Sequence, residues 1–162
     1  MRNIRALAGA AFAAAALVSL AARAAEERFD ACDVFTQADA EKALGTTAAP
    51  EPVNPKARRP KVITTCTYNG FKEGKPVAAT VQFRFERGEA EARDAFENAR
   101  LQYQTKPMLI PGTNGAFWSA KTGQLNVLKG RTWITVTLGG PKPADRDDET
   151  ARKLAEALAP KI

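Results

Sequence analysis

The stretch VAATVQFRFERGEAEARDAFENARLQYQ, residues 77–104, decides the fold because its hydrophobic period changes part-way along. In residues 77–86 apolar side chains alternate with polar ones, which is typical of a half-buried antiparallel strand. Over residues 88–104 the apolar positions follow a helical spacing instead. These positions are Ala92, Phe96, Ala99 and Tyr103. A strand followed by an amphipathic helix is therefore predicted.

The segments before this stretch predict one helix and one strand. Thr36 and Asp39 have the spacing of a capping box for a helix over residues 37–44, and Gly45 would end it. The next segment, KVITTCTYNG (61–70), is rich in β-branched residues and ends in an Asn-Gly turn signal. It is expected to pair with the strand at 77–86 as a hairpin.

The segments after it predict a meander and a closing helix. Strands are expected at 116–120, 124–129 and 132–138, joined by tight turns. Residues 147–162 have the pattern of an amphipathic helix. The order is α-β-β-α-β-β-β-α without repeating βαβ units, which predicts a single α+β domain. Its mostly antiparallel five-stranded sheet would be flanked by helices.

The first 24 residues have the parts of a secretory signal peptide. Arg2 and Arg5 precede an Ala-rich apolar run, and a small-x-small exit follows at Ala22-Arg23-Ala24. The run is short for a membrane helix of about 20 strongly apolar residues, so a retained anchor is the less favoured alternative. Cleavage after Ala24 would leave the domain 25–162 and lower the formal net charge from +6 to +3. We expect a periplasmic or secreted protein.

The two cysteines, Cys32 and Cys66, predict a disulfide. The chain contains no histidine, so a metal site would lack ligands and a thiol nucleophile would lack its usual base. A lipid anchor would need a cysteine directly after the apolar run, where Arg23 stands. Two cysteines in an exported chain are most simply a disulfide. Two buried free thiols are the alternative.

The absence of histidine also closes most catalytic schemes, because histidine is the usual general base and the commonest metal ligand. No glycine-rich segment has the spacing of a phosphate-binding loop. We therefore predict no catalytic residue, no metal site and no cofactor. A histidine-free hydrolase that uses paired carboxylates stays open as an alternative.

A candidate binding face lies on the strand at 132–138. Trp133 and Thr135 would point to the face opposite the core, beside Gln82 and Arg84 of the strand at 77–86. An aromatic ring, a guanidinium and hydroxyl groups suit a polar or acidic ligand. The alternative is that a helix covers this face and that Trp133 belongs to the core.

The proline-rich residues 46–60 predict an irregular, solvated loop that carries a basic cluster. The cluster consists of Lys56, Arg58, Arg59 and Lys61. No aromatic residue lies among these cations, as nucleic-acid binding would favour. Nucleic acid is therefore not an expected partner.

The assembled segments resemble a group of small exported bacterial proteins of unknown function. The resemblance rests on ACDVFTQADAEKALG, TTCTY, PGTNGAFW, LNVLKGRTWITVTL and ETARKLAEALAPKI. The fold of this group is similar to that of PsbP, an extrinsic photosystem protein, which implies a central antiparallel sheet between helices. Many members are actinobacterial lipoproteins, but this chain lacks the lipidation cysteine, so no stable membrane anchor is expected after cleavage. The resemblance supplies no catalytic residues.

These patterns together predict an exported, non-catalytic binding or accessory protein of the cell envelope. Its partner would be another envelope protein or a small polar ligand, and it would act as a monomer. The first alternative is an inhibitor of a secreted or host enzyme that presents the 46–60 loop. The second is the carboxylate hydrolase.

Overall fold

The computed structural model describes residues 29–50, 52 and 62–162. The predicted signal peptide, residues 1–24, lies outside the described residues. The basic cluster at residues 56–61 and most of the 46–60 loop lie outside them as well. None of the described helices is long and apolar enough to cross a membrane.

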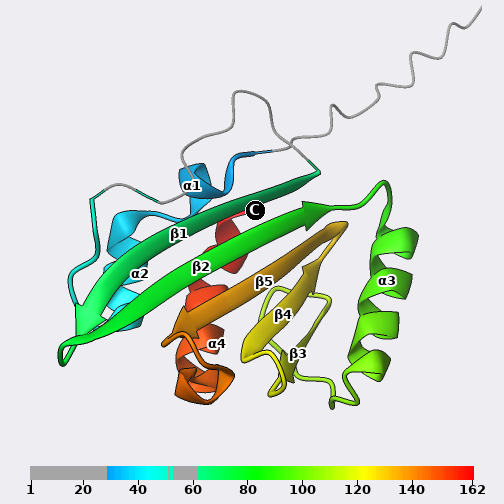
Figure 1. The fold of residues 1–162 in the computed structure, drawn as a ribbon. Coiled ribbons are helices and arrows are strands. Elements are labelled where there is room, and N and C mark those ends of the chain that lie inside the picture. The colour runs from blue at the N-terminus through cyan, green and yellow to red at the C-terminus, as the bar shows by residue number, and fades with distance from the viewer. Residues whose placement is uncertain (1–28, 51, 53–61) are drawn as a thin grey trace, which may run out of the picture.

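The described chain forms a five-stranded sheet and four α-helices (Figure 1). The helices are α1 (Ala31–Val34), α2 (Gln37–Leu44), α3 (Glu89–Gln102) and α4 (Asp148–Leu158), with 3-10 turns η1 (Pro143–Asp145) and η2 (Ala159–Lys161). The strands are β1 (Ile63–Lys72), β2 (Lys75–Phe85), β3 (Gly115–Ser119), β4 (Gln124–Lys129) and β5 (Thr132–Gly139). They lie in the order β1-β2-β5-β4-β3, and every neighbouring pair is antiparallel. The predicted α+β class is confirmed, and the four-residue α1 is an addition to the predicted order.

The start and end of α2 follow from its sequence as predicted. The Thr36 side chain accepts a hydrogen bond from the Asp39 backbone, and the Asp39 side chain accepts one from the Thr36 backbone. Gly45 ends the helix in the left-handed region, with φ of 66°. Both caps satisfy backbone groups that a helix end leaves without partners.

The predicted Asn-Gly turn is wrong, because Asn69 and Gly70 lie inside β1. The hairpin instead turns at Glu73 and Gly74, whose φ values of 52° and 74° match the twist of the strands on either side. Gly70 is required for a different reason: a Cβ there would lie 2.7 Å from the backbone oxygen of Thr47. The loop after α2 therefore lies close against β1 at this glycine, where Ala48 and Gly70 form an isolated antiparallel bridge.

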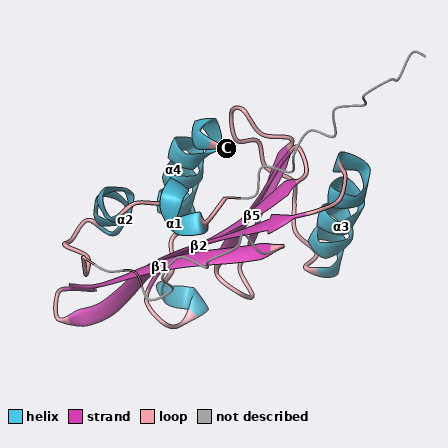
Figure 2. Cartoon of the chain, turned by 90° about the horizontal axis from the view of Figure 1, so that it is seen from above, coloured by secondary structure: helices cyan, strands magenta, loops and turns pink. Residues whose placement is uncertain are grey.

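One face of the sheet carries the main core, under α1, α2 and α4. The strands contribute their alternate residues, among them Val81, Phe83, Ile134 and Val136, all with no exposed surface. The inward face of α4 is Ala151, Leu154, Ala155 and Leu158, as its spacing predicts. Figure 2 shows α4 and α3 on opposite sides of the sheet.

The opposite face is covered only in part. Phe96 of α3 packs against Phe117 and Leu128 in a second, smaller core over β3 and β4. Of the predicted helical face, Ala92 and Phe96 are buried here, whereas Tyr103 lies just past the end of α3 at Gln102 and is exposed. Among the described helices, only α3 contributes to this second core. The outer face of β1 and β2 therefore lies beside α3 and is not covered by it.

The disulfide Cys32–Cys66 is present and joins α1 to β1, with 5.1 Å between the two Cα atoms. This confirms the predicted pairing. Cys66 has no exposed surface, so the bond lies within the main core.

Candidate binding groove

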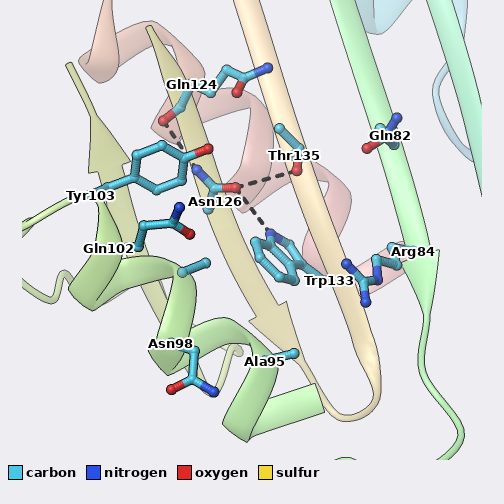
Figure 3. A pocket seen from close by; sticks show the side chains of 11 residues that line it. Gln82, Arg84, Ala95, Asn98, Gln102, Tyr103, Gln124, Asn126, Trp133 and Thr135 are labelled. Carbon is cyan, nitrogen blue, oxygen red and sulfur yellow. Dashed lines mark hydrogen bonds between the residues drawn. The ribbon is translucent and has the colours of Figure 1, made fainter. Parts of the chain in front are cut away.

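The four residues predicted for a binding face come together at one groove. Strand pairing sets Gln82 opposite Thr135 and Arg84 opposite Trp133. All four line a groove of about 420 Å³ between α3 and the sheet (Figure 3). The structure therefore places these side chains on one face, as the alternation of both strands indicates. Their role in binding stays a prediction.

The groove has a second wall and a floor that the sequence reasoning missed. Ala95, Asn98 and Gln102 come from α3, while Gln124 and Asn126 come from β4. The α3 residues follow the i, i+3, i+7 spacing, one stripe beside the buried Phe96. The β4 residues alternate with the buried Leu125 and Val127. These two patterns can be assigned to one site only when the position of α3 over the sheet is known.

Trp133 lies at the border between the second core and the groove. Its ring meets the ring of Phe96 edge-on, with 5.5 Å between centroids, and its Nε1 donates to Asn126 Oδ1 at 3.0 Å. The Arg84 guanidinium lies 5.6 Å from the indole centroid. α3 therefore packs against one side of the indole, as the core interpretation expects, and the groove adjoins the rest of the indole.

The polar side chains of the floor hold one another in place. Asn126, which is buried, also accepts a hydrogen bond from Thr135 Oγ1 at 3.4 Å. Gln82 Nε2 donates to Thr65 Oγ1 at 3.2 Å. Neighbours on rigid strands fix these side chains, so their donor and acceptor atoms lie at defined positions.

The groove carries little net charge. Arg84 is the one charged side chain among its described lining residues. Its Nε lies 2.5 Å from Oε1 of Glu86, a carboxylate that is 8% exposed. Arg84 and Glu86 form an ion pair, but their contact at Oε1 does not have the geometry of a hydrogen bond. The guanidinium charge is thus partly compensated before any ligand arrives.

The carboxylates with shifted pKa values serve helix starts and lie outside the groove. Asp147 caps α4, and hydrogen bonds from Thr150 lower the pKa of its carboxyl. Hydrogen bonds from Lys161 and Thr36 outweigh the effect of burial at Asp39, so its pKa is lowered too. A general acid needs a pKa shifted upward. Among the described residues there is also no group of three or more side chains placed to hold a metal ion.

No protein-family model, curated protein or solved structure matches the chain. The predicted relationship to PsbP-like proteins therefore stays a prediction.

Proposed function

We propose that the chain is an exported, non-catalytic binding protein that holds a small polar ligand in the groove between α3 and the sheet. The observation that carries the proposal is the lining of the groove. Carboxamides and hydroxyls converge there from α3, β2, β4 and β5 around a half-buried indole. A concave site with a few convergent polar groups on rigid elements is the usual form of a ligand site.

Two features support export. The N-terminal residues have the composition of a signal peptide. The Cys32–Cys66 disulfide is consistent with an oxidising compartment, because the cytosol keeps most thiols reduced. A periplasmic or secreted location follows from the two together.

The groove favours binding over hydrolysis. A carboxylate hydrolase needs two facing carboxyl groups in one cleft, and no carboxylate lines the described part of this groove. The inhibitor alternative depends on the 46–60 loop, most of which lies outside the described residues. A ligand-binding module is therefore the function that the described geometry supports best.

The experiment is native mass spectrometry on protein purified from a periplasm and incubated with a small-molecule extract of the cell envelope. We expect a bound mass on the native protein. The double variant Gln82→Ala/Gln102→Ala removes groups from both walls at half-buried and exposed positions. It should lose that mass and keep its fold.

The matched control is Lys153→Ala, an exposed side chain on α4 outside the groove. It should keep the bound mass. A bound mass that survives equally in the groove variant would contradict the proposal, as would a native protein that takes up nothing from the extract.

A further inference from the structure

Two rows of uncharged polar side chains run out of the groove across the sheet. One row contains Asn126, Thr135, Gln82 and Thr65, and the other contains Gln124, Thr137, Thr80 and Thr67, in the order β4, β5, β2, β1. In the first row, neighbouring strands set each residue opposite the next. The second row follows the same pairing from β5 to β1 and is continued to β4 by a side-chain hydrogen bond.

The rows reach well beyond the groove. Neighbouring strands lie about 4.8 Å apart, so a row from β4 to β1 is about 14 Å long. The side chains are linked along it: Thr67 and Thr80 hydroxyls lie 3.0 Å apart, and Gln124 Nε2 donates to Thr137 Oγ1 at 3.3 Å. Within the described chain, α3 packs over β3, β4 and the start of β5, which leaves the β1 end of both rows uncovered (Figures 1 and 2).

The chemistry of the rows selects a neutral ligand that forms many hydrogen bonds. An apolar ligand would bury the donor and acceptor sites that these amides and hydroxyls do not use with one another, at a cost of about 1–3 kcal/mol for each unsatisfied buried group. An anionic ligand would find one cation, Arg84, which is already paired with Glu86. Carboxamides and hydroxyls both donate and accept, so they match a ligand whose own groups do the same.

We infer that the ligand is a neutral oligosaccharide, lying along the two rows with one end in the groove beside Trp133. The inference rests on the proposed function. It adds the class of the ligand and the direction in which the ligand lies, from the groove across the sheet towards β1. Sugar hydroxyls both donate and accept hydrogen bonds, and the less polar faces of the rings suit an aromatic neighbour. Tyr103, which is 36% exposed, lines the α3 side of the same groove.

Two tryptophans on opposite faces provide the test. Trp118 packs against the main core, so Trp118→Phe leaves Trp133 as the single indole, beside the groove. Trp133→Phe leaves only Trp118 and is the matched control. The probes are cellotriose, maltotriose and tri-N-acetylchitotriose, each with its monosaccharide, and trigalacturonate as the charged counterpart.

At least one neutral trisaccharide should give a saturable change in the fluorescence of Trp118→Phe and none in that of Trp133→Phe. Adding Thr67→Ala, which lies in a row and, like its partner Thr80, outside the groove lining, should weaken the trisaccharide about fivefold through one lost hydrogen bond. It should leave any binding of the monosaccharide unchanged.

No saturable response to any neutral trisaccharide at about 10 mM, or tighter binding of trigalacturonate, would overturn the saccharide assignment. Equal weakening of the monosaccharide by Thr67→Ala would overturn the proposed direction. These failures are separable from failure of the proposed function, because a groove-dependent bound mass of another chemistry would leave the binding module standing.

Discussion

The indole of Trp133 serves packing and the groove at once. It contacts Phe96 in the second core, and its Nε1 satisfies the buried oxygen of Asn126. A buried amide oxygen without a donor costs about 1–3 kcal/mol, so this hydrogen bond fixes both residues. The floor of the groove is therefore held by the same contacts that close the smaller core.

At Asp39 the effect of pH follows from the direction of its pKa shift. Burial raises the pKa of this carboxyl, but hydrogen bonds from Lys161 and Thr36 bring it below 3.8. A carboxyl with a lower pKa in the folded chain stabilises the fold above the unfolded value and loses that contribution as pH falls through the folded value. Asp39→Asn should therefore lower the free energy of unfolding by about 1 kcal/mol near neutral pH.

Urea unfolding from about pH 7 to about pH 2 checks this, since the gap between Asp39→Asn and the native protein should close below pH 3.8. Glu149→Gln is the control, because Glu149 and Lys153 form an exposed pair on α4. Its effect should be about 0.5 kcal/mol or less. A gap for Asp39→Asn that is constant with pH would contradict the assigned role of the charge.

At the scale of elements, period and caps predict most of the fold. The alternation in residues 77–86 and the helical spacing after it place β2 and α3, and the capping box and Gly45 give the two ends of α2. The turn between β1 and β2 was not predictable from Asn69-Gly70. Glycine is required at position 70 because the backbone of Thr47 lies close to it, and not because the chain turns there. The contact of Gly70 with Thr47 joins residues that local sequence rules do not relate.

The groove, too, can be predicted from the sequence only in part. Alternation predicts that Trp133, Thr135, Gln82 and Arg84 share a face, because that depends only on strand period and pairing. The α3 side of the groove depends on where the helix packs. Asn98 and Gln102 read alone as ordinary polar positions of a surface helix. They become part of a site only when Phe96 docks against Phe117.

Gly70→Ala tests the close approach of the loop after α2 to β1. The new Cβ would lie 2.7 Å from the Thr47 oxygen, so backbone must move. We expect a loss of about 1–3 kcal/mol in the free energy of unfolding. Gly88→Ala is the control, since a Cβ there has open space and the residue has extended φ of −156°. Chemical denaturation that finds equal effects for the two variants would contradict the proposed crowding.

At the scale of the whole molecule, the disulfide joins the N-terminal helices to the sheet. It joins Cys32 and Cys66, which lie 34 positions apart in the sequence. Such a crosslink stabilises by about 3–4 kcal/mol on the chain-entropy estimate. Cys66→Ser should therefore lower the melting temperature by about 10–15 °C.

Calorimetry of the oxidised protein, the reduced protein and Cys66→Ser makes this comparison. Reduction and substitution should have effects of similar size, because both open the same loop. A melting temperature that is unchanged by either treatment would show that the core alone carries the fold.

The central claim is that ligand binding occurs in the groove between α3 and the sheet. The measurement that tests it most directly is mapping of backbone amide chemical shifts in ¹⁵N-labelled protein as envelope extract is added. We expect shifts confined to α3, the outer face of β2, β4 and β5, and the neighbouring end of β1. Shifts confined to the α2–α4 side, or an unchanged spectrum, would contradict it.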